Sequence, residues 1–359
     1  MIEVFYTEQL AVMKDKNVFY IEQQLQPTEC KVYFMVKLKK ILKYFLLLIL
    51  ILLAIIIYNS VYLDIPKETV ISKHAKGASE FIELKDGSLI HVRDEGKKNG
   101  STLVLIHGFN GSLFNFESMN KFLLDDFRII SMDLPAHGLT GPVNSDDYSI
   151  DGFIRVINEV LEIKNINKFY LAGHSMGGRV VWEFTIDYPE KVSGLLIIGS
   201  AFLANEEEYR EFQSENAPPI AFKLLEIPFF RQMLGYITPR FIVTQAAYQT
   251  VYNQNIITEE LIDQFHEIIL LEGSREAIGN LIVNNEKDFI TDPKLLQNIK
   301  IPTLILHGEE DNLVDVRFNK HFLENIPSIS LILYPKVGHM PPMEIPEIIA
   351  EDIKNFIVN

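Results

Sequence analysis

Short apolar runs alternate with longer amphipathic stretches along most of the chain. Six runs of about five residues are mostly apolar and bounded by turn residues, as expected of strands buried on both faces. They cover residues 102–106, 128–132, 168–172, 194–198, 302–306 and 330–334. Helical periodicity between them predicts a mainly parallel sheet with helices packed against it, and therefore an α/β fold.

Residues 80–84 and 89–93 are predicted to form a hairpin at the start of this sheet. Asp86-Gly87 lies between them and is a strong turn pair. Ser149 is a good N-cap for a helix that runs to about Ile163.

Residues 203–293 lie between the strands at 194–198 and 302–306 and have helical periodicity. Prolines interrupt it at Pro218-Pro219, Pro228 and Pro239, which predicts a helical insertion. The first half of the insertion is strongly apolar, with Phe222, Leu224, Leu225, Ile227, Phe229, Phe230, Met233, Tyr236 and Phe241. These side chains either pack the insertion onto the core or form an acyl-binding or membrane-facing surface.

A longer apolar run, residues 44–63, carries no charge and consists mainly of Leu and Ile. Its length suits a hydrocarbon core of about 30 Å, so the run predicts one transmembrane helix. A buried helix of the globular part is the alternative. Residues 1–43 would then precede the membrane, and residues 64–78 would form a linker after it.

Charged residues at the two ends of the run predict its orientation. The lysines nearest before it are Lys37, Lys39, Lys40 and Lys43, and Asp64 follows it. By the positive-inside rule the N-terminus is cytoplasmic and the remaining chain exoplasmic. No small-x-small cleavage site follows the run, which favours an uncleaved signal anchor over a cleaved signal peptide. Met35 opens a signal-anchor pattern of its own, and we hypothesise that translation starts there.

Charge and cysteine content narrow the classes of function. The chain of 359 residues has a net charge of −15, and the seven lysines and five acidic residues within 1–43 leave −17 on the rest. Such an acidic domain is a poor partner for nucleic acid. Cys30 is the only cysteine and lies before the apolar run, so the following domain cannot depend on a disulfide.

Gly173-His174-Ser175-Met176-Gly177 follows the strand at 168–172 and precedes a stretch that predicts a helix up to Pro189. In a G-x-S-x-G turn between strand and helix, the serine adopts a strained backbone and neighbouring chains leave no room for side chains at the two glycines. The pattern also occurs by chance, so the order of strand, turn and helix carries the prediction. Ser175 is the candidate nucleophile.

Two later strands lead into residues that could complete a catalytic triad. The strand at 302–306 is followed by His307-Gly308-Glu309-Glu310-Asp311, and the strand at 330–334 by Val337-Gly338-His339. A helix and a strand fit between Asp311 and His339, so both can emerge at one edge of a parallel sheet. Asp311 is the candidate acid, with Glu309, Glu310 and Asp315 as alternatives, and His339 is the candidate base.

These motifs, together with His107-Gly108-Phe109 and Asp133-Leu134-Pro135-Ala136-His137-Gly138, make residues 79–357 resemble the α/β-hydrolase superfamily. The resemblance implies a core of residues 79–202 and 294–359, with 203–293 as a helical cap over the active site. It also implies that the backbone N–H groups of Phe109 and Met176 form an oxyanion hole. Ala136 and Thr140 replace a glycine and a serine usual in the family, which puts the shape of that loop in question.

The resemblance further implies a membrane-anchored serine hydrolase that cleaves a carboxylic ester, with lipophilic esters favoured by the anchor. A carbon–carbon bond hydrolase, a cofactor-free perhydrolase and a non-catalytic ligand-binding protein are alternatives. Serine at position 175 disfavours the dehalogenases and epoxide hydrolases of this fold, which use an aspartate nucleophile. No metal-ligand cluster or nucleotide motif is present in the sequence, so we expect no cofactor.

Other polar residues near the motifs are expected to have structural roles. His107 and His137 are expected to organise loops, Asp133 to be structural, and His174 to point away from Ser175. Asn110-Gly111-Ser112 matches the N-glycosylation pattern beside the predicted oxyanion loop, where a glycan would obstruct the site. We therefore expect a bacterial cell envelope.

Overall fold

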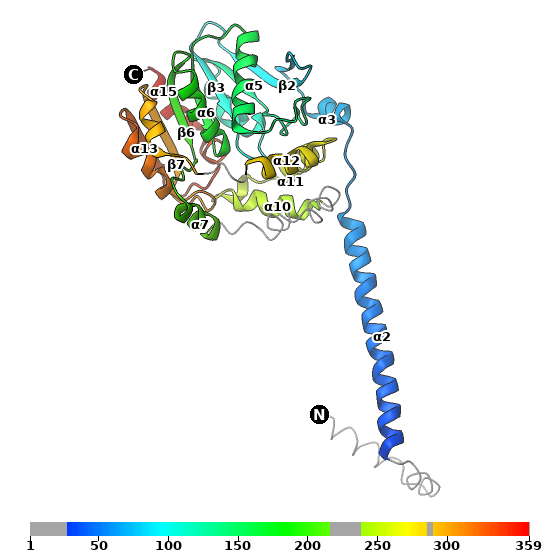
Figure 1. Cartoon of the computed structure of the whole chain (residues 1–359). Coiled ribbons are helices and arrows are strands. Elements are labelled where there is room, and N and C mark those ends of the chain that lie inside the picture. Colours follow the sequence, from blue (N-terminus) through cyan, green and yellow to red (C-terminus); the bar gives the residue numbers. More distant parts are fainter. Residues whose placement is uncertain (1–26, 216–237, 286–289, 359) are drawn as a thin grey trace, which may run out of the picture. The chain divides into compact units, whose positions relative to one another are not determined.

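The computed structural model describes residues 27–215, 238–285 and 290–358 (Figure 1). The chain divides into two compact units, Met1–Asn59 and Ser60–Asn359, and each is described by itself. Helix α2 (Pro27–Ser60) belongs to the first unit except for its last residue. The beginning of the predicted cytoplasmic segment, up to residue 26, lies outside the described residues.

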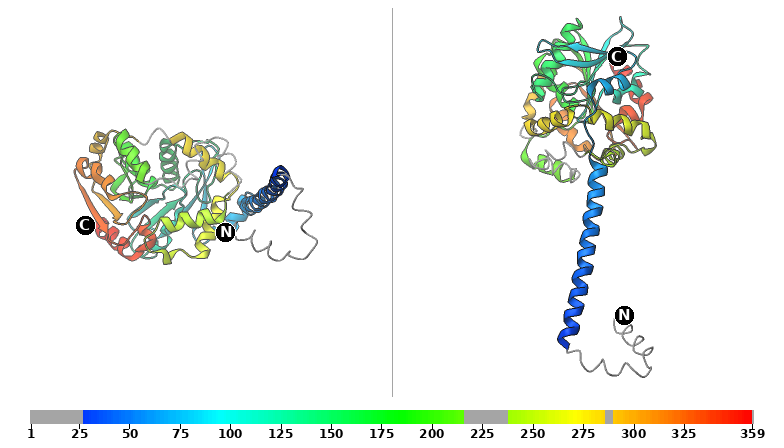
Figure 2. Two further views of the ribbon diagram at one scale, coloured as in Figure 1. Left: turned by 90° about the horizontal axis from the view of Figure 1, so that it is seen from below. Right: turned by 90° about the vertical axis from the view of Figure 1, so that its right-hand side faces the viewer.

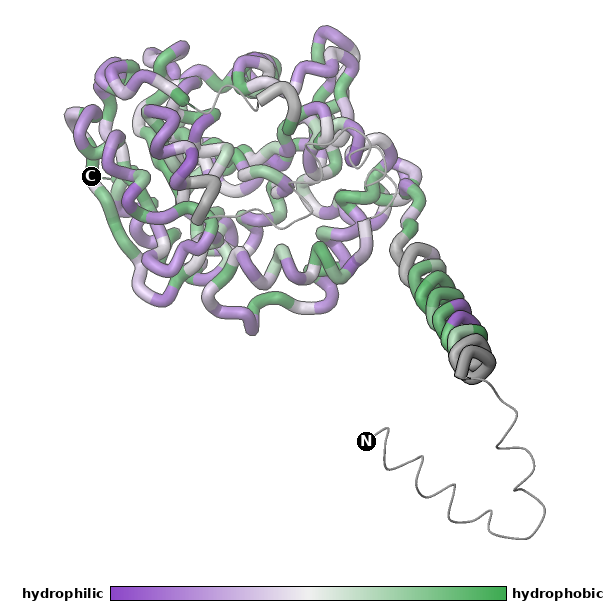
Figure 3. The backbone as a smooth tube through the Cα atoms, turned by 60° about the horizontal axis from the view of Figure 1, so that its bottom comes forward, coloured by the Kyte–Doolittle hydropathy of each residue, from purple (hydrophilic) through white to green (hydrophobic). Residues whose placement is uncertain are grey.

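Helix α2 exposes large apolar side chains, among them Leu46, Leu50 and Leu53. Figure 3 shows its described central part coloured mostly as hydrophobic. Across the described residues, no helix is both long enough and apolar enough to cross a membrane. The transmembrane helix predicted at 44–63 is therefore unconfirmed. Part of that run, Ile56, Ile57, Asn59 and Ser60, lies outside the residues whose side chains are described.

Eight strands of the described part of the second unit form one sheet in the order β1-β2-β4-β3-β5-β6-β7-β8. The strands are β1 (Ser79–Glu83), β2 (Leu89–Gly96), β3 (Thr102–Ile106), β4 (Arg128–Met132), β5 (Phe169–His174), β6 (Val192–Ile198), β7 (Thr303–Gly308) and β8 (Ile329–Tyr334). Strand β2 pairs antiparallel with β1 and β4, and the other neighbouring pairs are parallel. The predicted hairpin and the mostly parallel sheet are confirmed.

Helices connect most of the strands. The α-helices in the described part of the second unit are α3 (Lys67–His74), α4 (Glu117–Asn120), α5 (Ile150–Ile163), α6 (Met176–Asp187), α7 (Glu206–Glu215), α10 (Arg240–Gln249), α11 (Glu259–Ile269), α12 (Ser274–Asn285), α13 (Lys320–Asn325), α14 (Pro341–Glu344) and α15 (Pro346–Val358). As predicted, Ser149 caps α5: its hydroxyl accepts the Gly152 N–H at 3.0 Å.

The helices cover both faces of the sheet (Figures 1 and 2). Val104 and Ile106 of β3 pack in one apolar cluster with side chains of α5 and α6. Leu103 and Leu105 pack on the other face with side chains of α4 and α15. Successive strand residues point to opposite faces, so a strand between two helical layers must be apolar at every position.

In its described residues the predicted cap, residues 203–293, contains the α-helices α7, α10, α11 and α12. Most of the apolar residues singled out there, from Phe222 to Tyr236, lie outside the described residues. Phe241 in α10 is described and is 64% exposed. The boundaries of core and cap stay a prediction.

Residues 64–78, expected to form a linker, are part of the globular unit. Helix α3 lies within them and buries Val70 in an apolar cluster with Leu271. Ile65 forms a parallel bridge with Leu271, and its N–H donates to the Leu270 carbonyl at 2.7 Å. The buried Arg275 guanidinium binds Asp64 at 2.5 Å. Apolar burial and this ion pair fasten the stretch to the helices of 259–285, which its length and composition alone did not indicate.

Candidate active site

Ser175 stands between the last residue of β5 and the first residue of α6, with φ 54° and ψ −120°. Residues with a β-carbon rarely adopt positive φ, and such strain persists only where the surrounding structure enforces it. Here the Ser175 N–H donates to the Ile198 carbonyl of β6 at 2.8 Å. The serine is therefore held on a sharp turn at the carboxyl end of the central strands.

The glycines around Ser175 are required by close backbone approach. A β-carbon at Gly173 would lie 2.1 Å from the Gly177 carbonyl oxygen, and one at Gly177 would lie 2.4 Å from the Ile106 oxygen. A β-carbon at Gly108 would lie 2.8 Å from the Ser175 β-carbon, so the loop after β3 runs directly beside the serine. This is the physical reason for the G-x-S-x-G spacing.

Asp311 and His339 form a buried hydrogen-bonded pair. Asp311 Oδ2 lies 2.7 Å from His339 Nδ1, and Asp311 Oδ1 accepts the N–H groups of Leu313 and Val314, each at 2.8 Å. Burial alone would raise the Asp311 pKa, but the electrostatic interaction with His339 and the hydrogen bonds with His307 and His339 hold the pKa below its usual range. The carboxylate is thus ionised, His339 Nδ1 donates to it, and His339 Nε2 is left as the acceptor.

His174 also contacts the residue expected to act as base. Its Nε2 lies 2.7 Å from the His339 carbonyl oxygen, which can only accept, so Nε2 carries the proton. Burial and, to a smaller extent, the electrostatic interaction with neighbouring His339 lower the His174 pKa to about 3, so the ring is neutral at pH 7. It connects the serine turn to a loop 165 residues away in sequence, and no sequence signal revealed this contact.

The three predicted triad residues follow parallel strands of one sheet: Ser175 follows β5, Asp311 follows β7 and His339 follows β8. Gly199 lies beside Asp311 and His339, since a β-carbon there would be 3.5 Å from Asp311 Oδ2 and 3.6 Å from His339 Nδ1. Within the described part of the chain the Ser175 hydroxyl makes no hydrogen bond. The structure thus joins Asp311 to His339 directly, and the catalytic roles of all three remain predictions.

The two predicted oxyanion-hole residues lie close to Ser175, one directly after it in the chain and the other in the loop after β3. Met176 begins α6 immediately after Ser175. Phe109 follows Gly108, which packs against the Ser175 β-carbon. Their function as donors remains a prediction.

Two of the alternative acids have other partners. Glu310 accepts the Val337 N–H at 3.1 Å, and Asp315 accepts the Arg317 N–H at 2.8 Å and caps a short helix. Asp311 is the carboxylate that binds His339.

Asp133 lies at the centre of a second buried polar cluster. Its carboxylate accepts the N–H groups of Leu113 and Leu139 at 2.7 and 2.8 Å and lies 2.6 Å from His91 Nδ1. His91 Nε2 lies in turn 2.9 Å from the Ser79 hydroxyl. The residue types match those of the predicted triad, but Ser79 begins an edge strand and Asp133 holds two loops together. The sequence reasoning did not identify His91.

His107 and the loop after β4 are organised by buried hydrogen bonds. His107 Nδ1 donates to the Gly108 carbonyl at 2.7 Å, and its Nε2 accepts the Leu134 N–H at 3.0 Å. Ala136 has φ 70°, the left-handed conformation that a glycine adopts without strain. The Thr140 hydroxyl donates to the Asp133 carbonyl at 2.8 Å. The two departures from the family pattern therefore leave a closed, hydrogen-bonded loop.

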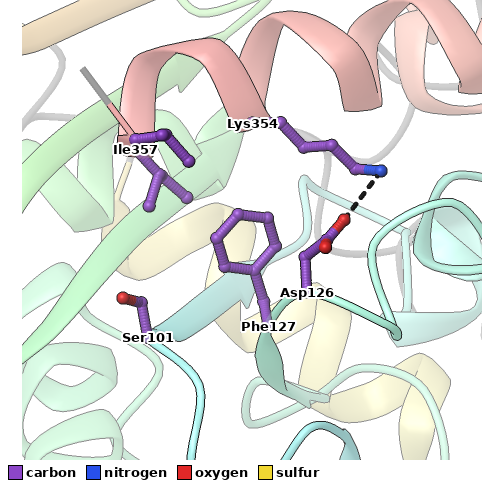
Figure 4. Close-up of a pocket in the computed structure, with 6 residues that line it drawn as sticks. Ser101, Asp126, Phe127, Lys354 and Ile357 are labelled. Atoms are coloured by element: carbon purple, nitrogen blue, oxygen red, sulfur yellow. Dashed lines mark ion pairs between the residues drawn. The ribbon is translucent and has the colours of Figure 1, made fainter.

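A surface cavity of about 370 Å³ lies away from these residues (Figure 4). Ser101 and Phe127 line it and immediately precede β3 and β4, and Lys354 forms an ion pair with Asp126 beside it at 2.9 Å. It therefore lies at the amino ends of the strands, opposite the edge that carries Ser175.

Among the described residues no group of His, Cys, Asp and Glu is arranged to hold a metal ion.

Comparison with known proteins agrees with this architecture. Residues 101–225, which include β3 through β6, match the family described as "alpha/beta hydrolase fold". These matches support the α/β-hydrolase superfamily as the family that the chain resembles and a hydrolase as its class of enzyme.

Individual relatives are similar over most of the chain. An uncharacterised hydrolase, YugF of Bacillus subtilis, is 28% identical over 74% of this chain and 92% of its own length. The human monoacylglycerol lipase ABHD6 is 28% identical over 72% of this chain and 75% of its own. Among solved structures, a meta-cleavage product hydrolase from Pseudomonas fluorescens has a TM-score of 0.66 at 20% identity and covers 77% of this chain and 97% of its own.

Proposed function

We propose that the protein is a serine hydrolase that cleaves a carboxylic ester through an acyl-enzyme on Ser175. His339 Nε2 takes the Ser175 proton as the hydroxyl attacks the ester carbonyl, and Asp311 stabilises the imidazolium. The N–H groups of Phe109 and Met176 bind the oxyanion. The tetrahedral intermediate collapses, the alcohol leaves with the proton from His339, and water then hydrolyses the acyl-enzyme with His339 again as base.

The observation that carries this proposal is the buried Asp311–His339 pair at the sheet edge where Ser175 occupies a strained turn. The ionised Asp311 fixes the proton on Nδ1, which is the tautomer a general base for Ser175 needs. Neutral His174 at the His339 carbonyl adds no competing positive charge.

Covalent labelling of the full chain in detergent with a fluorophosphonate probe tests this function. Peptide mass should place the label on Ser175, and Ser175→Ala should remove both labelling and ester hydrolysis. Ser79→Ala is the matched control, because Ser79 also contacts a histidine paired with an aspartate. Labelling at Ser79, or turnover by Ser175→Ala, would show that the nucleophile has been misassigned.

Lipophilic esters are the proposed substrate class. The lipase among the relatives supports it, and so does the uncharged apolar run at 44–63. A panel of p-nitrophenyl esters from acetate to decanoate measures the preference. A kcat/KM highest for acetate and falling with each added carbon would contradict it.

Carbon–carbon bond hydrolysis is the second candidate. A relative from Burkholderia vietnamiensis favours it, described as a 2-hydroxy-6-oxononadienedioate/2-hydroxy-6-oxononatrienedioate hydrolase. It is 26% identical over 77% of this chain. The same triad would serve either reaction. Turnover of a dienoate of that class, followed by loss of its ultraviolet absorbance, with no turnover of the ester panel, would favour this function.

We further propose that residues 44–63 anchor the protein in a bacterial membrane with the N-terminus cytoplasmic and the catalytic domain exoplasmic. The absence of charge in the run and the lysines before it support this arrangement. Membrane fractions washed with alkaline carbonate should retain the full chain, and protease added to intact spheroplasts should digest the domain after residue 64. Release by carbonate, or protection from protease, would contradict it.

A further inference from the structure

The loop that carries His339 is hydrogen-bonded to residues 250–253, which directly follow α10. The His339 N–H donates to the Thr250 carbonyl at 2.8 Å. One residue earlier, the Gly338 N–H donates to Glu344 Oε1 at 2.9 Å. The backbone of the candidate base is thus held by a segment within the helical insertion and by a carboxylate on α14.

Glu344 joins these two segments. Its second oxygen, Oε2, accepts the N–H groups of Tyr252 and Asn253 at 2.8 and 3.0 Å. One carboxylate therefore accepts from the His339 loop on one side and from the 250–253 segment on the other. A carboxylate can accept on both oxygens, whereas an amide in its place offers a single acceptor oxygen.

Close packing accompanies these hydrogen bonds. A β-carbon at Gly338 would lie 2.7 Å from the Tyr252 nitrogen and 2.9 Å from the Val251 carbonyl carbon, so the two backbones are in direct contact. Met340, which follows His339, packs in one apolar cluster with Val251 and with side chains of α10 and α11. The His339 loop and the insertion therefore cannot move independently without breaking this cluster.

We propose that Glu344 is a positioning residue that couples the helical insertion to the general base. By holding residues 250–253 against the His339 loop, it sets the direction of His339 Nε2 relative to Ser175. The inference rests on the proposed function, in which His339 takes the Ser175 proton. It adds that the insertion contributes to the chemistry itself, because displacement of a catalytic group by about 1 Å can cost about 10²-fold in rate.

Three variants of the full chain test the coupling. Glu344→Ala removes both sides of the contact and Glu344→Gln retains an acceptor for only one. Glu347→Gln alters an exposed carboxylate three residues further along and serves as the matched control. At a temperature where all variants are folded, we expect fluorophosphonate labelling and kcat to fall 10- to 100-fold in Glu344→Ala and less in Glu344→Gln, with KM within about twofold. Glu347→Gln should match the wild type.

Ester length separates positioning from two other roles. A misplaced base slows every ester, so the expected loss in kcat is equal for p-nitrophenyl acetate and decanoate. A loss confined to decanoate would mean that Glu344 only shapes an acyl pocket, and a lower melting temperature with wild-type labelling would mean that it only stabilises the fold. Either result would overturn the inference while Ser175 labelling in the wild type still supported the proposed function. No labelling of the wild type would overturn both.

Discussion

Replacing Asp311 with asparagine should leave the fold intact and abolish most of the activity. The wild-type carboxylate accepts two backbone N–H groups on Oδ1, from Leu313 and Val314, and faces His339 Nδ1 with Oδ2. An asparagine has one acceptor oxygen and one NH₂ donor to distribute between these sites. The outcome depends on which orientation the amide adopts.

The hydrogen bonds decide the orientation. With the amide oxygen toward His339, two buried N–H donors would face an NH₂ group and lose their acceptor, at a cost of about 1–3 kcal/mol each. With the oxygen toward Leu313 and Val314, both backbone bonds are kept, and the NH₂ group replaces Oδ2 opposite His339 and 3.2 Å from His307 Nε2. The His307 Nε2–H still has the Val314 carbonyl as its acceptor at 2.8 Å, so this orientation is preferred. The amide then donates to His339 Nδ1, which places the histidine proton on Nε2. In that tautomer His339 cannot accept the Ser175 proton.

We therefore expect Asp311→Asn to lower kcat by about 10⁴-fold, equivalent to roughly 5.5 kcal/mol in the activation free energy. The assays are ester hydrolysis and the fluorophosphonate labelling rate on the full chain, with circular dichroism to verify folding. Glu310→Gln is the matched control and should stay within about threefold of the wild type, because Glu310 contacts the Val337 backbone and not His339. An Asp311→Asn variant with more than a hundredth of the wild-type kcat would refute this reasoning, and a simultaneous loss in Glu310→Gln would identify Glu310 as the acid.

Two further predictions concern stability. Gly138 and Gly77 both have positive φ, so alanine should cost about 1–2 kcal/mol in strain at either site. At Gly138 the added β-carbon would also lie 2.0 Å from the Asp133 carboxyl carbon, so chemical denaturation should show Gly138→Ala less stable than Gly77→Ala by several kcal/mol. Equal losses would contradict the tight packing around Asp133. The His174 pKa of about 3 in the fold lies below the 6.5 of an unfolded chain, so the unfolded state binds the extra proton and this histidine should cost stability as pH falls below about 6.5. Between pH 7 and pH 5 this residue should lower the free energy of unfolding by roughly 2 kcal/mol. In His174→Gln the amide can still donate to the His339 carbonyl, so the free energy of unfolding should fall by roughly 2 kcal/mol less over the same pH range. Identical pH dependence of the two proteins would show that His174 is not held neutral.

Local patterns predicted the strands and the serine turn well. The run at 102–106 coincides with β3, and the run at 128–132 with β4, because strands buried on both faces must be apolar throughout. The turn at Ser175 was readable because close packing allows only glycine at 173 and 177. Each of these features is encoded within a few consecutive residues.

Long-range contacts could not be predicted in the same way. His174 was expected to point away from Ser175, but the sequence held no indication that its ring would bind the His339 carbonyl. The exchange of neighbours that places β4 between β2 and β3 has no local signature either. Glu344 accepts from two segments separated by more than 80 residues, and neither contact has a motif. These features depend on how distant elements pack.

The attachment of residues 62–75 to the globular unit determines where a shortened protein can begin. A chain started at β1 would lack Asp64 and the Tyr62 carbonyl, both of which bind the Arg275 guanidinium, at 2.5 and 2.9 Å. That buried charge would lose these two partners and keep only its longer bond to the Thr238 hydroxyl, at 3.4 Å, among those described, and Leu271 would lose the apolar cover of α3. Expression boundaries placed at the first predicted strand would therefore yield a destabilised domain, whereas a start at or before Ser60 keeps the whole second unit.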